Sequence, residues 1–505
     1  MDKSNLFVLE ENVIGIPFLV KGKLIQPPSI KYQDLKEAFE GTDIGADYLK
    51  INEAQVIREP ITGNQTTECT DGYIYQVMPI IKAEDLIEND IDNLVKTLYS
   101  LSVAEILDYL DNIGNYLCKN KNLLSQAAKI YGLTAKYPDN IINAQLSAIS
   151  KTLNGKTAKD IIDAELSYNG KPGSAFLNGW VKVNNKGVAV RAMPTRQLHI
   201  TAGNAFEVPI ISALRAVLTK SAAVIKMPRE ALISGALLAV AAYNTAPNHP
   251  ITQNMSLVYW RGGDYEIEKD LFKPKAFDRI IVWGGANAVT AIQNQNPFVR
   301  VISFNPKYGI SLIGKKCFSA NLKETVAKAL KDVLINNQNS CNASLVHYVE
   351  GTKEQVNEYA LLIQQGLKNY DRIAPNFVIP DAAGQIKRMK RGKYAGEKWY
   401  LNYTNENYVS GATVINGEFD ILDHPLSRLV VIRPVDKAED ALKYIHQSVS
   451  TVGIFPEKLR LELKEQILGR GASTVLPLGQ CDTVFGGMPH DGMIVLSQLV
   501  DWKTG

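Results

Sequence analysis

The sequence predicts an α/β fold built on a doubly wound parallel sheet. Strand-like runs, glycine turns and helix-like runs follow one another through the centre of the chain, as in "RQLHITAGN" followed by "FEVPIISALRAVLTK". "SAAVIKMP" then precedes the apolar stretch 231–243, and both "SLVYWRGGD" and "RIIVWGGANAV" place paired glycines after a strand-like run. This succession is typical of parallel strands joined by crossover helices.

The bulk composition is that of an ordinary soluble globular protein. With 505 residues, the chain can bury a large core and divide into two or three domains. Hydrophobic residues make up 46% and charged residues 21%, and the net charge is only +3. This balance gives no reason to expect a nucleic-acid partner. The longest uncharged apolar stretch, 231–243, is too short to span a bilayer and predicts a buried helix.

The cysteines and histidines suggest neither disulfides nor a metal. No C-x-x-C pair occurs, and the six histidines show no metal-ligand spacing. The N-terminus is acidic and interrupted by Pro17, so it does not resemble a signal peptide. We infer a reducing cytoplasm, in which a free thiol can act as a nucleophile. The five cysteines are Cys69, Cys118, Cys317, Cys341 and Cys481.

Helix-like and strand-like patterns continue on both sides of the central region. Residues 1–80 combine short β-like runs with turn residues, whereas "DNLVKTLYSLSVAEILDYLDNIGNYL" repeats its leucines at helical spacing. Pro209 is tolerated because it falls in the first turn of its predicted helix. "NLKETVAKALKDVL" and "EQVNEYALLIQQGLK" predict helices on either side of the strand "SLVHYVEG".

The junction "INNQNSCNA" places Cys341 among small and amide side chains, between a predicted helix and a predicted strand. Buried structural cysteines usually lie among aliphatic residues. A nucleophilic thiolate needs hydrogen-bond donors and access to substrate, and we expect the amides or the helix end to lower the pKa of Cys341. His347 lies at an even offset on the strand and could share a face with Cys341, although a core or surface histidine fits that position better.

Polar residues follow two neighbouring predicted strands, at the sheet edge where ligands bind in such folds. Asn204, after "HITAG", could direct an amide N–H at an oxyanion, or could simply form a turn beside glycine. Lys226 ends an apolar strand, where a charge is costly unless it meets an anion or solvent. With Arg229, three residues later, it would suit a ribose bearing a 2′-phosphate. The alternative is an exposed pair of loop cations.

Two glycine turns are candidate phosphate-binding elements. Gly262 and Gly263 follow one strand, and Gly284 and Gly285 follow the next. Glycine permits close approach of a backbone to a ligand, and a helix after Gly285 would offer N–H groups to a phosphate. Neither turn has the G-x-G-x-x-G pattern, so the two are informative mainly as a pair.

His490 lies in the glycine-rich segment "GGMPHDGM", next to Asp491, and is a candidate acid or base. A second segment, 386–400, is densely basic with aromatic residues at its end. It could be a docking site for the phosphates of a bulky ligand or for an acidic carrier protein. A solvated loop or edge hairpin fits the composition better, and nucleic acid fits it least.

The ordered set "AGNAFEVPIISALRAVLTKSAAVIKMP", "RIIVWGGANAV" and "NNQNSCNAS" resembles the core of the aldehyde dehydrogenase superfamily. The C-terminal "STVLPLGQ" and "GGMPHDGMIVLSQLVDW" resemble its acyl-CoA reductase branch, represented by the fatty-acyl reductase of bacterial luminescence systems. The resemblance covers about 191–502. It implies a Rossmann-type cofactor domain, an α/β catalytic domain and a small β oligomerisation flap, in a homo-oligomer.

The resemblance also implies roles for individual residues. Asn204 would hold the oxyanion, Lys226 the cofactor ribose, Gly284 the phosphate, and Cys341 would be the nucleophile. Gly285 stands where a serine is usual. Arg229 stands where many NAD-using members have a ribose-binding glutamate, and a guanidinium there favours NADPH over NADH.

The resemblance further implies a division of the chain into five parts. We expect an N-terminal region with oligomerisation or bridging elements, a cofactor-binding domain, a catalytic domain carrying the nucleophile, a return to the cofactor domain, and a C-terminal segment. Their expected bounds are 1–80, 81–310, 311–425, 426–470 and 471–505.

Two departures from the family pattern indicate the reaction. The stretch "SFNPKYGISLIGKK" lacks the acid that activates water in hydrolytic aldehyde dehydrogenases, which favours acyl transfer to or from a thiol. The usual acid that grips the nicotinamide ribose is matched only by Asp423. We therefore predict NADPH-dependent reduction of a long-chain acyl thioester, from CoA or an acyl-carrier or acyl-activating protein. The alternatives are an NADP-dependent aldehyde dehydrogenase that releases acid, and an inactive scaffold.

Overall fold

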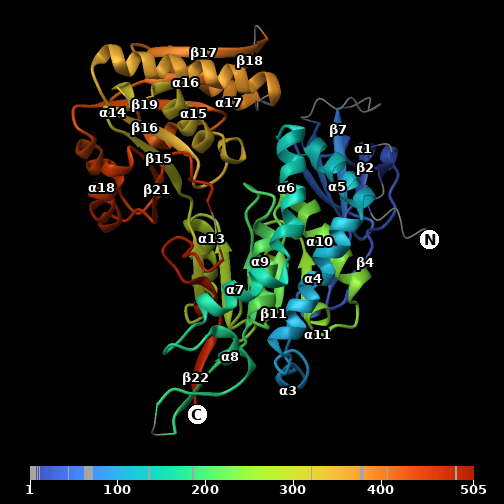
Figure 1. Cartoon of the computed structure of the whole chain (residues 1–505). Coiled ribbons are helices and arrows are strands. Elements are labelled where there is room, and N and C mark those ends of the chain that lie inside the picture. Colours follow the sequence, from blue (N-terminus) through green and yellow to red (C-terminus); the bar gives the residue numbers. More distant parts are fainter. Residues whose placement is uncertain are drawn as a thin grey trace.

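The computed structural model describes residues 7, 9–10, 12–43, 45–61, 72–134, 137–184, 187–319, 321–375, 380–405, 408–483 and 486–505. These residues form two seven-stranded sheets, one five-stranded sheet and one three-stranded sheet. Figure 1 shows the second seven-stranded sheet and its helices, coloured yellow to red, set apart from the first sheet and the N-terminal elements. No described helix combines the length and apolar character that a bilayer crossing needs.

The first seven-stranded sheet has the strand order β14-β13-β10-β11-β12-β3-β4. Its first five strands are parallel, and β3 and β4 extend it in antiparallel fashion. The predicted doubly wound α/β fold is confirmed. The strands are β10 (Arg196–Ile200), β11 (Ala222–Lys226), β12 (Met255–Val258), β13 (Arg279–Trp283), β14 (Arg300–Phe304), β3 (Phe18–Val20) and β4 (Lys23–Ile25).

Helices connect these parallel strands. Pro209 lies in the first turn of its helix, as expected, where the missing N–H costs no hydrogen bond. The apolar stretch 231–243 forms most of α10, and its side chains are buried almost throughout. The helices after the strands are α9 (Val208–Leu218), η1 (Arg229–Ala231), α10 (Leu232–Thr245), α11 (Pro250–Gln253), α12 (Tyr265–Leu271) and α13 (Ala286–Gln295).

The second seven-stranded sheet has the order β17-β18-β19-β16-β15-β20-β21 and is parallel except for the β17–β18 pair. The chain crosses between the two sheets in the few residues that join β14 to β15. The strands are β15 (Tyr308–Ile313), β16 (Ser344–Glu350), β17 (Lys398–Asn405), β18 (Tyr408–Ile415), β19 (Leu429–Val435), β20 (Val449–Phe455) and β21 (Thr474–Pro477).

Residues 426–470 do not return to the first domain, in contrast to the sequence-based expectation. β19 pairs with β16, and β20 pairs with β15, in the middle of the second sheet. Both strands are buried along most of their length, as parallel strands covered on two faces must be. An apolar run shows that a strand is buried but does not identify the sheet that it joins, which explains the wrong expectation.

Helices cover the second sheet, and one face packs against α15 and α16. The N-cap Asn321 accepts a hydrogen bond from the Glu324 N–H, which fixes the start of α15. The helical elements are α14 (Lys316–Ser319), α15 (Leu322–Val333), η2 (Ile335–Gln338), α16 (Lys353–Ile373), α17 (Pro380–Arg391), η3 (Ile421–Asp423), η4 (Ala438–Tyr444) and α18 (Glu457–Gly469).

The N-terminal region forms a separate five-stranded sheet and contributes β3 and β4 to the first domain. The role of residues 1–80 in oligomerisation stays a prediction. The five strands are β1 (Leu9–Glu10), β2 (Val13–Gly15), β5 (Tyr48–Ile51), β6 (Ala54–Pro60) and β7 (Tyr73–Pro79). The helices between residues 32 and 178 are α1 (Tyr32–Glu40), α2 (Ala83–Leu86), α3 (Ile91–Lys96), α4 (Val103–Lys119), α5 (Lys121–Thr134), α6 (Asp139–Thr152), α7 (Gly155–Glu165) and α8 (Gly173–Asn178).

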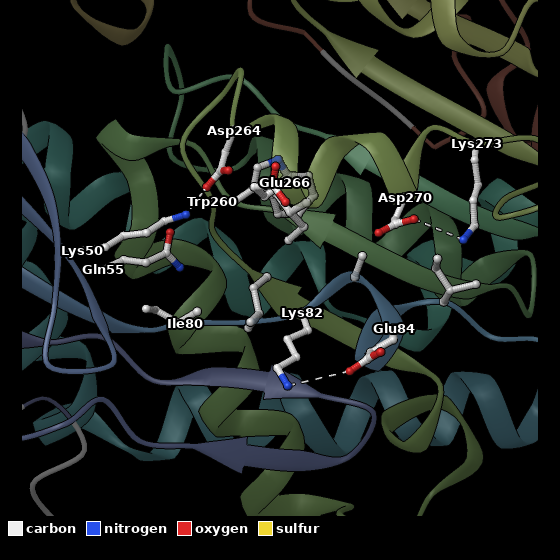
Figure 2. A pocket seen from close by; sticks show the side chains of 14 residues that line it. Lys50, Gln55, Ile80, Lys82, Glu84, Trp260, Asp264, Glu266, Asp270 and Lys273 are labelled. Atoms are coloured by element: carbon white, nitrogen blue, oxygen red, sulfur yellow. Dashed lines mark hydrogen bonds and ion pairs between the residues drawn. The ribbon is translucent and has the colours of Figure 1, made fainter.

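A charged cavity of about 460 Å³ lies between the five-stranded sheet, α2 and α12 (Figure 2). Its walls combine lysines and acids, and Lys82 lies 3.9 Å from Glu84 and Lys273 lies 3.3 Å from Asp270. None of the residues predicted to carry chemistry lines it. Because each charge on its walls is paired with an opposite charge, the cavity indicates no particular ligand.

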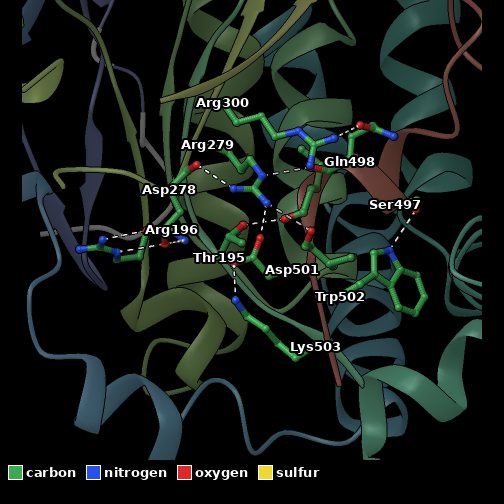
Figure 3. Close-up of polar contacts among 12 residues, drawn as sticks. Thr195, Arg196, Asp278, Arg279, Arg300, Ser497, Gln498, Asp501, Trp502 and Lys503 are labelled. Carbon is green, nitrogen blue, oxygen red and sulfur yellow. Dashed lines mark hydrogen bonds and ion pairs between the residues drawn. The ribbon is translucent and has the colours of Figure 1, made fainter. Parts of the chain in front are cut away.

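The C-terminal segment is fixed along the first domain by a group of polar contacts (Figure 3). Arg279 donates hydrogen bonds to the carbonyls of Gln498, at 3.2 Å, and Val500, at 3.4 Å, and pairs with Asp501. Thr195 Oγ1 donates to the Leu499 carbonyl at 2.6 Å. These contacts hold the segment that follows the His490 loop. Its elements are α19 (Val495–Leu499) and β22 (Asp501–Thr504), and β22 joins β9 (Ala189–Met193) and β8 (Val181–Lys182) in the three-stranded sheet.

Candidate active site

Cys341 lies in a tight loop between α15 and β16. The loop backbone is left-handed at three successive residues, with φ values of 48° at Asn336, 52° at Asn337 and 70° at Gln338. A left-handed conformation costs most L-residues about 1–2 kcal/mol, and asparagine tolerates it best. The repeated amides of "INNQNSC" therefore allow this backbone conformation, which brings Cys341 to the carboxyl end of the loop.

Buried side chains hold this loop in place. Arg428 is fully buried, and its Nε donates to Asn337 Oδ1 at 2.7 Å. Its Nη1 lies 3.2 Å from Asp371, so the charge is paired. Gln338 Nε2 donates to the Leu429 carbonyl at 2.7 Å. The start of β19 thus fixes the residues just before the nucleophile.

Asn204 connects the first domain to the same loop. Its carbonyl accepts hydrogen bonds from Tyr137 Oη at 2.9 Å and from Asn336 Nδ2 at 3.1 Å. Its side-chain Nδ2 donates to the Asn339 carbonyl at 3.3 Å. An amide nitrogen has two N–H groups, so one remains to meet an oxyanion. The structure therefore brings Asn204 to the loop of Cys341, which the turn-forming alternative does not require.

The Cys341 thiol is partly exposed, as access to a substrate requires. Burial raises its pKa above the ordinary value, and the Asp491 carboxylate raises it further. A hydrogen bond with the Ser450 side chain and the positive charge of Lys307 act in the opposite direction but do not prevail. The expectation that neighbouring amides lower this pKa is wrong in sign, because the loss of water outweighs them.

His490 packs in an aromatic and cationic environment. Its Nδ1 accepts a hydrogen bond from Arg215 Nη2 at 3.0 Å, and its ring lies 4.9 Å from that of Phe304 and 5.4 Å from that of Trp283. Burial, together with the charges of Arg215 and Lys307, lowers its pKa to about 3. The imidazole is therefore neutral near pH 7, and these surroundings favour a positioning role over the predicted acid or base role.

Asp491, the neighbour of His490, was not singled out from the sequence. Its carboxylate lies 3.5 Å from Lys307 Nζ, and the two side chains are only 10% and 13% exposed. Lys307 also donates to Ser473 Oγ at 2.8 Å. The Asp-Gly pair in "PHDGM" is a recognised turn signal that could have directed attention to Asp491. Its negative charge raises the pKa of the Cys341 thiol.

Lys226 ends β11 in a buried position beside two aromatic rings. Its Nζ lies 5.5 Å from the centre of the Tyr259 ring and 5.4 Å from that of Trp260. Burial lowers the pKa of Lys226 to about 8, although the charges of Glu268 and Glu230 oppose the shift. A cation in such a slot suits an anionic or hydroxyl-bearing ligand.

Arg229 has different surroundings from Lys226. Its Nε lies 2.6 Å from Glu59 Oε1, and Nη1 pairs with Asp47. Glu59 lies on β6, and Asp47 directly precedes β5. Arg261, on the next loop, lies 3.7 Å from Asp47. The guanidinium is thus neutralised by two carboxylates, and a 2′-phosphate would have to displace at least one of them.

The two glycine turns have different surroundings. Gly263 has a φ of 82°, and its N–H donates to Glu268 Oε2 at 3.2 Å. The Gly284 N–H donates to the Phe304 carbonyl at 3.1 Å. Gly285 precedes α13 without a side-chain cap, and a Cβ there would meet nothing within 4 Å. A Cβ at Gly262 or Gly263 would also meet nothing within 4 Å, so both turns are open. Gly285 is itself the N-cap of α13, and the first N–H groups of that helix fit a phosphate.

The remaining candidate residues make contacts that stabilise the fold. His347 is buried, and its Nδ1 shares a hydrogen bond with Tyr359 Oη at 2.9 Å, which agrees with a core histidine. In the basic segment 386–400, Lys393 lies 2.7 Å from Asp423. Asp423 is thereby paired within the second domain. Among the described residues, no group of three or more His, Cys, Asp or Glu side chains could hold a metal ion.

The overall fold is that of the aldehyde dehydrogenases. The NADP-dependent glyceraldehyde-3-phosphate dehydrogenase of Bacillus halodurans matches with a TM-score of 0.70 and 14% identity, covering 97% of this chain and 98% of that one. Aldehyde dehydrogenase 21 of Physcomitrella patens matches with a TM-score of 0.69 and 11% identity, covering 97% of both chains. At these identities the likeness establishes the fold.

Residues 98–502 match the family model described as acyl-CoA reductase (LuxC). The chain belongs to this family, which confirms the predicted resemblance. A long-chain acyl-protein thioester reductase of Photorhabdus laumondii is 27% identical over 453 residues, covering 85% of this chain and 91% of the relative. Its counterpart in Vibrio harveyi is 25% identical over 416 residues, covering 80% and 82%.

Proposed function

We propose that the protein reduces a long-chain fatty acyl thioester to the aldehyde through an acyl-enzyme on Cys341, with NADPH as the reductant. The observation that carries this proposal is the direct contact between the Asn204 loop and the Cys341 loop. The family supports the reaction class, and the names of the relatives support an acyl-protein thioester as the donor. Acyl-CoA is the second candidate donor.

The proposed chemistry begins with attack of the Cys341 sulfur on the thioester carbonyl. The second N–H of Asn204, together with the Cys341 backbone N–H, would stabilise the tetrahedral oxyanion. Collapse of this intermediate releases the donor thiol and leaves the acyl group on sulfur. When bound, the reduced nicotinamide supplies the hydride that converts this thioester to a thiohemiacetal. Breakage of the carbon–sulfur bond to Cys341 then gives the aldehyde.

Residues of the first sheet fit the reductant. Lys226 would donate to ribose hydroxyls from its aromatic slot, and the open start of α13 at Gly285 would receive a phosphate. NADPH, rather than NADH, requires Arg229 to exchange a carboxylate for the 2′-phosphate. A solved relative in fold, the Bacillus halodurans enzyme, is complexed with NADP, which supports the choice.

One observation favours a second function, the oxidation of aldehyde to free acid. The segment 303–316 contains no carboxylate that could activate water beside the acyl-enzyme. Asp491, however, comes from the other end of the chain and is near enough for its charge to raise the pKa of the Cys341 thiol, and a carboxylate in that region could serve a water molecule. The reductive function is preferred because it agrees with the family.

In the experiment, the purified protein is incubated with palmitoyl-carrier protein or palmitoyl-CoA in the presence of NADPH or NADH, and the aldehyde formed is measured. In a separate reaction, the protein is incubated with hexadecanal and NADP⁺, and the free acid formed is measured. The reductive function predicts aldehyde from at least one thioester, faster with NADPH. Rapid release of acid without any thioester reduction would establish the oxidative alternative instead.

The proposed assembly is a homo-oligomer formed through the three-stranded sheet. Strands β8 and β22 stand at the two edges of this small sheet, and exposed edges are suited to pairing. Light scattering gives the mass in solution, and a monomer would contradict this proposal without affecting the proposed chemistry.

A further inference from the structure

The backbone carbonyl of Asn204 is held by two side chains from distant parts of the chain. Tyr137 Oη donates to it at 2.9 Å, and Asn336 Nδ2 donates to it at 3.1 Å. A carbonyl oxygen has two lone pairs, so both of its acceptor positions are occupied. The peptide group of Asn204 is therefore fixed from two directions, although the residue itself is exposed in a loop.

The first of these donors lies just before α6, in an aromatic cluster. Tyr137 immediately precedes Pro138, the N-cap of α6, and a residue before proline is restricted to extended conformations. The Tyr137 ring lies 6.1 Å from that of Tyr131, which in turn lies 4.6 Å from that of Phe206. Tyr137 is only 8% exposed, and Phe206 is fully buried two residues after Asn204. The cluster therefore joins the hydroxyl group to the loop that it contacts.

The second donor is oriented by α6 itself. Gln145 Nε2, on this helix, donates to Asn336 Oδ1, so the amide nitrogen of Asn336 is the atom that faces the Asn204 carbonyl. The Asn204 side chain completes the connection, because its Nδ2 donates to the Asn339 carbonyl at 3.3 Å, two residues before Cys341. One short stretch at the start of α6 thus supports both the oxyanion loop and the nucleophile loop.

We propose that Tyr137 is a positioning residue for the oxyanion site, whose hydroxyl sets the direction in which Asn204 presents its remaining side-chain N–H. This role rests on the proposed reductase function and adds to it a residue that acts through Asn204 rather than on the substrate. One Asn204 N–H is used on the Asn339 carbonyl, so the other has a single direction once the peptide group is fixed. An oxyanion donor acts only when it is aimed at the developing charge, so a small rotation of Asn204 should slow the reaction without unfolding the protein.

The Tyr137 hydroxyl remains a hydrogen-bond donor throughout the neutral pH range. Burial raises the pKa of Tyr137, and the negative charge of Glu207 raises it further. A hydrogen bond with the Asn336 side chain acts in the opposite direction and does not prevail. The phenol therefore keeps the proton that it donates to the Asn204 carbonyl.

The test compares Tyr137→Phe, which removes only the hydroxyl group, with the wild-type protein in two reactions of Cys341. Single-turnover acylation by palmitoyl-CoA or palmitoyl-carrier protein, without nucleotide, passes through a tetrahedral oxyanion, whereas alkylation by iodoacetamide does not. Acylation should slow by about tenfold, the upper value for the loss of one neutral hydrogen bond, while the rate of Cys341 alkylation should be unchanged. A general displacement of the nucleophile loop would slow both reactions.

A double mutant tests whether Tyr137 acts through Asn204. Asn204→Ala should slow acylation by about 100-fold, and Tyr137→Phe should slow it no further in that background. Tyr109→Phe is the matched control, since Tyr109 is 2% exposed and its hydroxyl forms a hydrogen bond with Thr252 Oγ1 at 3.0 Å, between α4 and α11. Its loss should leave acylation unchanged.

Gln145→Leu provides a second variant, because it releases the Asn336 amide from the other side, and it should also slow acylation but not alkylation. Acylation of Tyr137→Phe as fast as in the wild type, equal slowing of both reactions, or additive effects in the double mutant would overturn the role of Tyr137. Failure of the wild-type protein to be acylated by either thioester would instead contradict the reductase function, and the positioning role would fall with it.

Discussion

The nucleophile loop and the cofactor edge of the first sheet are built in different ways. Around Cys341, buried side chains from separate elements fix the backbone, and Arg428 and Asn204 both contact the loop. At the cofactor edge, the backbone itself shapes the open turn at Gly285, and Lys226 stands among aromatic rings. The nucleophile loop therefore depends on side chains distant in sequence, whereas the turn at Gly285 depends mainly on its local backbone.

The largest expected effect is on the support of the nucleophile loop. Arg428→Ala should lower the free energy of unfolding by about 3–5 kcal/mol, because it removes a fully buried guanidinium that pairs with Asp371 and donates to Asn337. Urea denaturation measures the change. Arg460→Ala on α18, which removes only a surface pair with Glu457, should cost less than about 1 kcal/mol. Equal effects of the two variants would show that the loop does not depend on Arg428.

The cofactor edge should instead respond to pH. Burial lowers the pKa of Lys226 to about 8, so the ammonium is charged below that pH and neutral above it. NADPH affinity, followed by nucleotide fluorescence, should be constant below pH 7 and weaken by up to about tenfold per unit above pH 8. Lys226→Arg keeps its charge and should flatten the profile. If the affinity of the wild-type protein did not change with pH, Lys226 would not contact the cofactor.

The sequence predicted those parts of the molecule that are determined locally. The alternation of strands, glycine turns and helices gave the first sheet, and the amide-rich segment identified the loop of Cys341. Partners distant in the chain were missed. Arg229 pairs with Glu59 and Asp47, which are 170 and 182 residues away. Neither the pairing of Arg229 with these acids nor the effect of the Asp491 charge on Cys341 leaves a local pattern.

The assignment of strands to sheets had the same limit. The apolar runs of β19 and β20 predicted buried strands, but the pairing with β16 and β15 arises from the crossover connections. Only the tertiary fold decides which sheet such a strand completes, so the expected return to the first domain was wrong.

A smaller effect separates backbone from side chain in the nucleophile loop. Asn336→Ala and Asn336→Gly both remove the hydrogen bond to the Asn204 carbonyl. Only glycine keeps the left-handed backbone without cost, so the free energy of unfolding should be about 1 kcal/mol lower for Asn336→Ala than for Asn336→Gly. Urea denaturation of the two proteins gives the difference directly. No difference between them would mean that the loop relaxes to another conformation.

The smallest effect concerns Arg229 at the cofactor edge. Asp47→Asn removes one of the two carboxylates that neutralise the guanidinium. Exposed ion pairs contribute about 0.2–1 kcal/mol, so NADPH should bind up to about fivefold more tightly while NADH binding is unchanged. Titration with both nucleotides measures this difference. Equal changes for the two nucleotides would show that Arg229 does not meet a 2′-phosphate.

The most direct test of the whole account is the mass of the protein after incubation with palmitoyl-CoA or palmitoyl-carrier protein in the absence of nucleotide. The account predicts one added palmitoyl group, located on Cys341 by peptide mapping, absent in Cys341→Ala, and discharged as hexadecanal when NADPH is added. Aldehyde formation by Cys341→Ala, or an acyl group on a different residue of the active protein, would contradict it.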